Sequence, residues 1–199
     1  EIYNYKKIID EHSINPKSNS DCEVIIPLYE KMNSINDLIL LLDGEFAMII
    51  HDKINKKIYA ARDRYGVRPL FVGKSGNDMI GFSSEMKALD KIMLNIKPLN
   101  PMKIVTLDYV NKIYEKHRYF DLDDKLPSSV SMLNNDIYKK IRNTLTIAVK
   151  KRLQSDRPIG FLLSGGLDSS LIVSIATKIL GTNNVITFSI GLPNSPDVI

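Results

Sequence analysis

The sequence predicts a chain of two differently built parts, an α+β part of mostly antiparallel sheet with helices beside it and then an α/β part. Short strand-like runs separated by turn signals fill the first 119 residues, which is typical of antiparallel hairpins. A polar stretch at 121–132 interrupts this pattern. An apolar run, a glycine-rich loop, a helical segment and a second apolar run then follow, in the order expected of a parallel βαβ unit.

The first part combines helices with hairpins. Asp21 to Met32 carries apolar residues at helical spacing, with Asp21 as a plausible N-cap, and 38–42 is a second short apolar stretch. After a turn at Asp43-Gly44, three hairpins are predicted, each made of two runs joined by a short turn: 46–51 with 58–61, 70–73 with 79–83, and 104–109 with 113–119. Ser84 to Ile92, between the second and third hairpins, predicts a further helix.

The second part begins with a long amphipathic helix over 135–153, whose apolar face we expect to pack into a core. The residues of that face are Ile137, Ile141, Leu145, Ala148, Val149 and Leu153. The all-apolar run 159–163 predicts a strand buried on both faces, 168–180 a helix, and 185–190 a second buried strand. We therefore divide the chain into a domain at 1–120, a linker at 121–132 and the first part of another domain at 133–199.

Composition restricts the class of protein. With 44% hydrophobic and 25% charged residues the chain can bury a core, and its net charge of +4 is scattered rather than gathered into a nucleic-acid-binding stripe. No apolar run approaches the ~20 residues that span a bilayer. A single cysteine, Cys22, excludes an internal disulfide and fits a cytoplasmic location. Because the chain starts at Glu1 and ends just after a strand-like run, we expect it to be cut at both ends.

The segment Ser164-Gly165-Gly166-Leu167-Asp168-Ser169-Ser170 has the chemistry of a phosphate-binding loop. Two glycines allow backbone amides to approach a ligand, and the following helix N-terminus adds unpaired N–H donors. The serines add hydroxyl donors, and the Asp168 carboxylate suits a Mg²⁺ held between it and phosphate oxygens. The alternative is a tight strand-to-helix turn in which Asp168 or Ser169 is only an N-cap.

This loop lacks the lysine with which the P-loop binds the terminal phosphates. The absence of that lysine favours release of pyrophosphate as a unit after attack on the α-phosphorus. The full pattern resembles the signature of the ATP-pyrophosphatase superfamily, which has an adenine-nucleotide alpha-hydrolase-like fold. In that superfamily, backbone groups of the strand before the loop and of the next strand form the adenine pocket. By position, these groups would belong to Leu162, Ile190 and Gly191.

Several upstream stretches resemble the class II glutamine amidotransferase domain, which implies an Ntn-hydrolase-like fold for the first part. They are residues 1–4, 20–25, 42–47, 61–70 and 83–89. The flanks 155–158 and 191–197 of the phosphate loop look like those of asparagine synthetases in particular. The resemblance covers nearly the whole chain in order and with matching spacing, which makes it more specific than any single motif.

The resemblance implies two half-reactions. One hydrolyses glutamine and releases ammonia, which travels through a tunnel. The other uses ATP and Mg²⁺ to convert aspartate into β-aspartyl-AMP, from which ammonia displaces AMP to give asparagine, with pyrophosphate as the other product. Small-molecule substrates are thus implied, with no nucleic-acid or membrane partner, and a homodimer is compatible with the family. Two alternatives remain: a ligase that adenylates another carboxylate, such as a β-lactam synthetase or another amide-forming enzyme, and a non-catalytic relative.

Roles carry over position by position. Glu1 aligns with the family's glutamine-binding glutamate, and Asp21 with the aspartate that holds the substrate's ammonium; the simpler interpretation of Asp21 is a helix N-cap. The family's nucleophile is an N-terminal cysteine upstream of this fragment, so we expect no glutaminase activity from the fragment itself and read Cys22 as a small packing residue. Arg62, Asp63 and Arg68 are candidate site residues, but we expect them to form a structural ion-pair cluster around the Gly66 turn.

Overall fold

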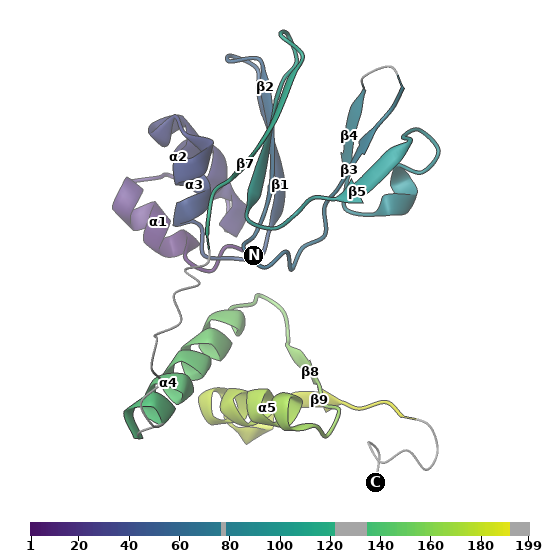
Figure 1. Cartoon of the computed structure of the whole chain (residues 1–199). Coiled ribbons are helices and arrows are strands. Elements are labelled where there is room, and N and C mark those ends of the chain that lie inside the picture. The colour runs from purple at the N-terminus through teal and green to yellow at the C-terminus, as the bar shows by residue number, and fades with distance from the viewer. Residues whose placement is uncertain (77–78, 122–134, 192–199) are drawn as a thin grey trace. The chain divides into compact units, whose positions relative to one another are not determined.

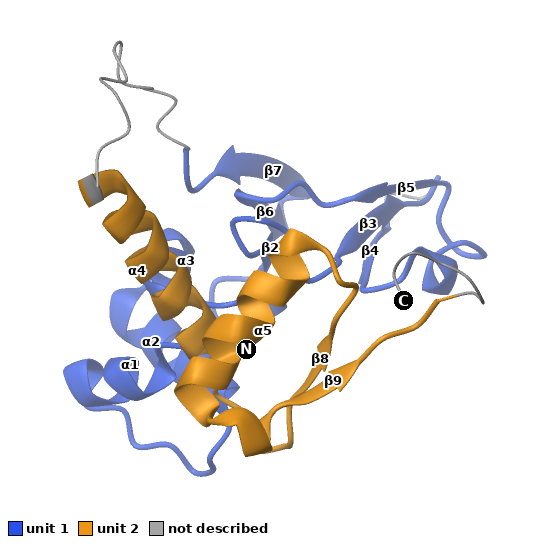
Figure 2. Cartoon of the chain, turned by 90° about the horizontal axis from the view of Figure 1, so that it is seen from below, with its two compact units in different colours: residues 1–124 blue, residues 125–199 orange. Residues whose placement is uncertain are grey.

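The computed structural model describes residues 1–76, 79–121 and 135–191. The chain forms two compact units, Glu1–Asp124 and Lys125–Ile199, which we describe separately (Figure 2). Apart from Asp121, the predicted linker 121–132 lies outside the described residues, as does the segment after Gly191. Among the described residues, no helix is both long and apolar enough to cross a membrane.

The first unit opens with helices: α1 (Tyr5–His12), the 3₁₀ turn η1 (Asp21–Val24), α2 (Ile25–Met32) and α3 (Ile35–Leu41). The helix predicted from Asp21 onwards is thus a 3₁₀ turn followed by an α-helix. Ser20, not Asp21, is the N-cap, because its hydroxyl accepts the Cys22 N–H at 3.4 Å. The Asp21 carboxylate instead accepts a hydrogen bond from the Ile2 N–H, so it serves a contact distant in sequence.

A four-stranded antiparallel sheet follows, in the order β1-β2-β6-β7. Its strands are β1 (Ala47–Asp52), β2 (Lys57–Arg62), β6 (Lys103–Asp108) and β7 (Ile113–Arg118). The two hairpins predicted here are confirmed within one or two residues. Lys56 and Lys112 adopt positive φ values of 57° and 56° in the turns that join the strands of each hairpin, which lets the chain reverse tightly.

A second sheet has the order β4-β3-β5, with β3 (Phe71–Lys74), β4 (Ile80–Ser83) and β5 (Asn95–Pro98). The β3–β4 hairpin is confirmed, but the helix predicted at 84–92 is wrong. Only a short 3₁₀ turn, η2 (Met86–Ala88), forms there. Of the apolar side chains in that segment, Leu89 is buried whereas Met86 and Ile92 are exposed, so no continuous apolar face exists for a helix to pack.

The β1-β2-β6-β7 sheet is covered on both faces. Ala61 and Ile104 point into a core shared with the helices, whereas their neighbours Ala60 and Val105 point into a second cluster with Leu70 and Leu99. This alternation follows the two-residue period of a strand. Figure 1 shows α1–α3 on one side of this sheet and β3–β5 on the other.

The second unit contains α4 (Asn135–Arg152), β8 (Gly160–Leu162), α5 (Leu167–Leu180), the 3₁₀ turn η3 (Thr182–Asn184) and β9 (Ile186–Phe188). β8 and β9 pair in parallel, with α5 between them in sequence. Val149, Ile175 and Ala176 form a small core there, joined by partly buried Leu145, Leu153 and Phe161.

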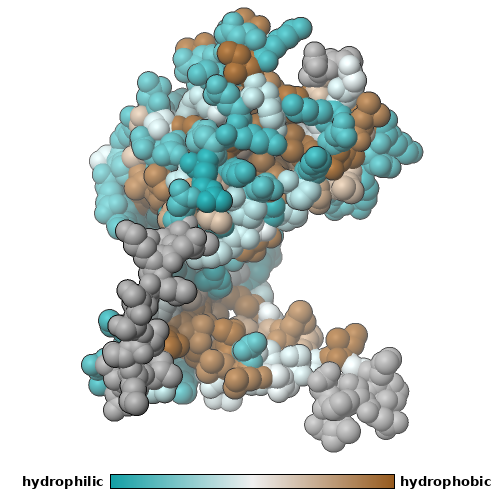
Figure 3. Space-filling view, viewed as in Figure 1, coloured by the Kyte–Doolittle hydropathy of each residue, from teal (hydrophilic) through white to brown (hydrophobic). Residues whose placement is uncertain are grey.

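Both strands of this unit were predicted to be buried, and within the described residues they are not. Leu162 is 82% exposed and Ile190 95% exposed, and Ile141, expected on the packed face of α4, is 57% exposed. Figure 3 shows apolar side chains of this unit at the surface. A strand is buried on both faces only where helices cover both, and the described elements are too few to do so.

Candidate functional site

The loop between β8 and α5 is open to a ligand. Gly165 has φ +80°, and a Cβ placed on it would meet no heavy atom within 4 Å. The Oγ atoms of Ser164 and Ser169 lie 3.0 Å apart, and the Ser169 hydroxyl donates to the Gly166 carbonyl at 3.2 Å. Gly166 is the N-cap of α5, and no side-chain hydrogen bond caps that end. Neither Asp168 nor Ser169 is thus the N-cap that the simpler interpretation requires.

The first turn of α5 suits a phosphate group. Its backbone N–H groups have no side-chain cap, and the helix dipole adds partial positive charge. Asp168 lies in this turn. Among the described residues no group of three or more His, Cys, Asp or Glu side chains could hold a metal ion, so a Mg²⁺ at Asp168 would take most of its ligands from phosphate oxygens and water.

The ends of β8 and β9 meet beside this loop. The Leu163 N–H donates to the Phe188 carbonyl at 2.8 Å, and the Ser189 hydroxyl donates to the Leu163 carbonyl at 2.6 Å. These bonds bring Leu162 and Ile190 to neighbouring strand ends, where both are exposed. Sequence reasoning missed Ser189; its signal is a hydroxyl at the carboxyl end of a largely apolar strand.

The first unit contains a cavity of about 440 Å³ whose wall includes Glu1, Cys22, Glu45, Arg68 and Ser84. It contains one predicted glutamine-binding residue, Glu1, and lies next to the other, Asp21. The sequence singled out neither Glu45 nor Ser84 as a site residue. Their signal was weak, because a lone glutamate after a glycine turn and a serine at a strand end are common surface features. The cavity thus contains two charged residues, Glu45 and Arg68, besides the predicted Glu1.

Residues 1–3 are held against 43–45 by main-chain hydrogen bonds. Glu1 and Glu45 exchange two bonds, each 2.9 Å long, between backbone nitrogen and carbonyl oxygen. Gly44 is required at the crossing, because a Cβ there would lie 2.2 Å from the Glu1 carbonyl oxygen. The Ile2 N–H donates to Asp21 Oδ2 at 2.5 Å. The structure therefore brings Glu1 and Asp21 together, although 20 positions separate them in the sequence.

Cys22 is exposed, so its interpretation as a packing residue is wrong. Its backbone belongs to the 3₁₀ turn η1 rather than to the buried face of a helix. Partial burial raises the pKa of the Cys22 thiol, and the adjacent Asp21 carboxylate raises it further. A raised pKa lowers the thiolate fraction, so Cys22 lacks the character of an activated nucleophile even though it lines the cavity.

Arg62 and Asp63 stabilise the loop around Gly66 through backbone contacts, not through the ion pairs that we expected. The Arg62 guanidinium donates to the carbonyls of Gly66, Arg68 and Leu99 at 2.5–2.8 Å. The buried Asp63 carboxylate accepts four backbone N–H groups, two on each oxygen, from Phe46, Tyr65, Val67 and Arg68. Because Phe46 and Arg68 both line the cavity, this carboxylate joins two parts of its wall.

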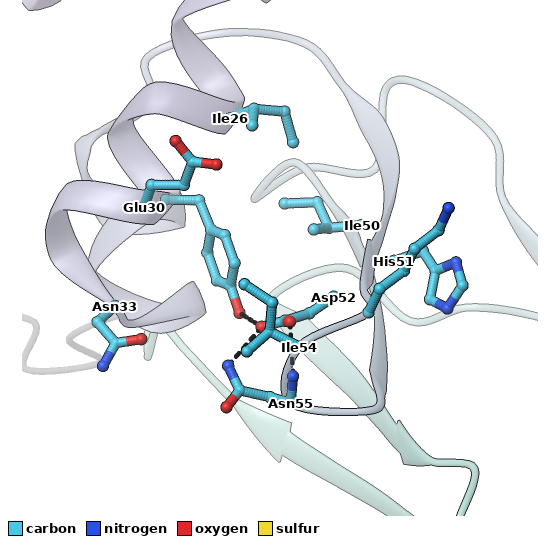
Figure 4. A pocket seen from close by; sticks show the side chains of 10 residues that line it. Ile26, Glu30, Asn33, Ile50, His51, Asp52, Ile54 and Asn55 are labelled. Carbon is cyan, nitrogen blue, oxygen red and sulfur yellow. Dashed lines mark hydrogen bonds between the residues drawn. The ribbon is translucent and has the colours of Figure 1, made fainter.

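A second cavity of about 520 Å³ lies between α2 and the end of β1 (Figure 4). Asp52 accepts hydrogen bonds from the Tyr29 hydroxyl at 2.7 Å and from the backbone and side chain of Asn55 at 2.8 and 2.7 Å. The Asn55 bonds, with that of Tyr29, lower the pKa of Asp52 to about 2. Because these polar groups bind one another, we read this network as structural.

Comparisons with known proteins match both parts of the chain. The family model described as "Glutamine amidotransferase domain" matches residues 1–149, and "Asparagine synthase" matches residues 140–199. A "Probable asparagine synthetase [glutamine-hydrolyzing]" of Acanthamoeba polyphaga mimivirus is 42% identical over 214 residues, and the "Asparagine synthetase [glutamine-hydrolyzing]" of Gallus gallus 34% over 226. Each alignment covers 100% of this chain and 39% of the relative, so the chain spans well under half the length of the curated relatives it matches.

Solved structures support the fold. Glutamine phosphoribosylpyrophosphate (PRPP) amidotransferase from B. subtilis superposes with a TM-score of 0.53 at 16% identity, over 98% of this chain and 45% of that one. The structure of the allosteric regulatory enzyme of purine biosynthesis superposes with a TM-score of 0.54 at 16% identity, over 98% of this chain and 46% of that one. The mixed α/β architecture with antiparallel sheets is thus that of a glutamine amidotransferase. The chain belongs to the glutamine amidotransferase domain family, and from residue 140 it matches the asparagine synthase family.

Proposed function

We propose that this chain is part of a glutamine-dependent asparagine synthetase, with the amidotransferase domain at 1–120, a linker at 121–132 and the first part of the synthetase domain at 133–199. The observation that carries the proposal is the presence, in one chain, of a cavity lined by Glu1 and Glu45 and an open phosphate loop at Ser164–Ser170. The names of the relatives favour glutamine and asparagine as substrate and product. We further expect a cytoplasmic enzyme.

In the glutaminase half, Glu1 and Asp21 bind glutamine. A carboxylate accepts hydrogen bonds from the substrate's ammonium and carboxamide N–H groups, and the Ile2 N–H fixes the orientation of Asp21. The nucleophile of the family is an N-terminal cysteine, which aligns upstream of Glu1. The exposed Cys22 does not replace it, because its raised pKa disfavours the thiolate. Hydrolysis would yield glutamate and ammonia.

In the synthetase half, residues around the β8–α5 loop bind ATP. Backbone groups of Leu162, Ile190 and Gly191 would contact adenine, and the loop would bind the phosphates through Ser164, Gly165, Gly166, Ser169 and Ser170. Asp168 would hold Mg²⁺, which neutralises phosphate charge when bound. The loop has no lysine to grip the terminal phosphates, which favours departure of pyrophosphate. The aspartate side chain would attack the α-phosphorus to give β-aspartyl-AMP, and ammonia would displace AMP.

The test uses the full-length protein with aspartate, ATP, Mg²⁺ and ammonia. The proposal requires asparagine, AMP and pyrophosphate in equal amounts, measured by chromatography. Formation of ADP and inorganic phosphate would exclude the adenylation mechanism. Turnover with a different acid but not with aspartate would favour the alternative of a related amide or β-lactam ligase. No turnover with any acid would favour a non-catalytic relative. Glutamine in place of ammonia then tests the first half.

A further inference from the structure

The cavity at Glu1 contains a second carboxylate whose position is fixed by the backbone. Glu1 and Glu45 exchange two main-chain hydrogen bonds, as directly opposed residues of an antiparallel ladder do. Side chains of such a pair lie on the same face. Both residues line the same cavity, so two acidic side chains border one binding space.

Tyr3 orients the Glu45 side chain. Tyr3 lies two residues from Glu1, on the same face of the ladder by strand alternation, and its hydroxyl donates to Glu45 Oε1 at 2.5 Å. The Tyr3 N–H also donates to the Asp43 carbonyl at 2.8 Å, which fixes the tyrosine against the segment that carries Glu45. Glu45 is therefore held in place before any ligand arrives.

Two like charges directly opposed across a ladder are destabilising by themselves. A ligand that offers N–H donors between them would offset this repulsion, whereas a ligand that carries another carboxylate there would increase it. Glutamine and glutamate differ in this respect. The carboxamide of glutamine presents two N–H donors, and the ionised side chain of glutamate presents acceptors only.

We propose that Glu45, oriented by Tyr3, accepts a hydrogen bond from the carboxamide of bound glutamine and thereby makes the cavity select glutamine over glutamate. This inference rests on the proposed glutaminase function. Asp21 is proposed to bind the substrate's ammonium, which leaves the carboxamide as the donor available to Glu45. After hydrolysis the product has a carboxylate in place of that donor. Repulsion by Glu45 then favours its release.

The test is Glu45→Gln in the full-length protein, with steady-state hydrolysis of glutamine and competitive inhibition by glutamate as the two measurements. The substitution keeps the shape of the side chain and removes its charge. We expect KM for glutamine to rise about fivefold, because a charged acceptor binds more strongly than a neutral one. We expect the inhibition constant of glutamate to fall about tenfold, because like-charge repulsion is removed. Damage to the fold would weaken the binding of both ligands. A weaker binding of glutamine together with a tighter binding of glutamate therefore distinguishes the proposed role from misfolding.

Tyr3→Phe should shift both constants in the same directions by a smaller factor. Glu115→Gln, at an exposed glutamate of β7, is the matched control and should leave both constants unchanged. If Glu45→Gln weakens the binding of both glutamine and glutamate, Glu45 contacts a group that they share, such as the ammonium, and the inference is wrong. Unchanged constants would also overturn it. Absence of glutamine hydrolysis in the unsubstituted protein would instead refute the proposed function.

Discussion

Asp63→Asn should destabilise the first unit more than any surface substitution. The Asp63 side chain is 2% exposed, and each of its oxygens accepts two backbone N–H groups at 3.0–3.3 Å. An asparagine has one oxygen and one NH₂ group, so in either orientation two of the four N–H donors would face another donor. A buried polar group left without its partner costs about 1–3 kcal/mol. We therefore expect a loss of roughly 2–6 kcal/mol, a large share of the stability of a typical domain.

Urea unfolding of the chain, followed by circular dichroism at pH 7, measures this loss as a fall in the midpoint of the first unit. Asp90→Asn is the matched control, since Asp90 is exposed and substitutions of that kind usually change stability by less than about 0.5 kcal/mol. A loss below about 1 kcal/mol for Asp63→Asn would refute the four-donor arrangement, because the isosteric side chain would then have satisfied its neighbours. In the full-length protein the same substitution should raise KM for glutamine, since Asp63 joins Phe46 to Arg68 in the cavity wall.

Other outcomes follow from single contacts. Asp168→Asn should reduce ammonia-driven asparagine formation by at least about 100-fold while leaving glutamine hydrolysis near its original rate; equal loss of both would contradict two separate sites. Gly44→Ala should raise KM for glutamine and leave ammonia-driven synthesis unchanged, because the new Cβ displaces Glu1. The pKa of Asp52 in the folded protein, about 2, lies below its pKa in the unfolded chain. The ionised Asp52 therefore stabilises the fold above about pH 4, and this contribution is lost as pH falls towards 2. Asp52→Asn should make stability depend less on pH over that range, as measured by acid unfolding. Burial, with the Asp63 charge, raises the pKa of Tyr119 to about 12. The stability that the protonated hydroxyl contributes below about pH 10 should therefore be lost as pH rises towards 12. Tyr119→Phe should lose less stability over that range.

Local patterns predicted the hairpins well because each hairpin depends on residues close in sequence. The turns at Lys56 and Lys112 and the alternation of Ala60 with Ala61 are features of short segments. The helix predicted at 84–92 does not form, because its apolar residues share no buried face: Leu89 is buried and Ile92 is exposed. β5 was missed because Asn95–Pro98 has no strand-like pattern and forms only through pairing with β3. Tertiary pairing of this kind leaves little trace in a local sequence.

The site predictions had the same limits. The phosphate loop is one continuous segment, so its residues could be named from spacing alone. The cavity of the first unit is assembled from five separated segments, and only resemblance to a family connected Glu1 with Asp21. Glu45 and Tyr3 could not be found that way, because their relation is a cross-strand contact between residues 42 positions apart. Structure was needed to show that Tyr3 contacts Glu45 and that Glu45 lines the same cavity as Glu1.

Both candidate sites depend on a glycine, but for different physical reasons. At Gly44 the conformation is accessible to any residue and the difficulty is space, since a Cβ would meet the Glu1 carbonyl oxygen at 2.2 Å. At Gly165 the space is empty and the difficulty is the backbone, whose φ of +80° is unfavourable for residues with a Cβ. The first glycine thus allows two segments to approach until their acidic side chains border one cavity. The second turns the chain so that its amides stay open to an anion. A side chain at Gly44 would move a binding residue, whereas one at Gly165 would change the direction of the loop itself.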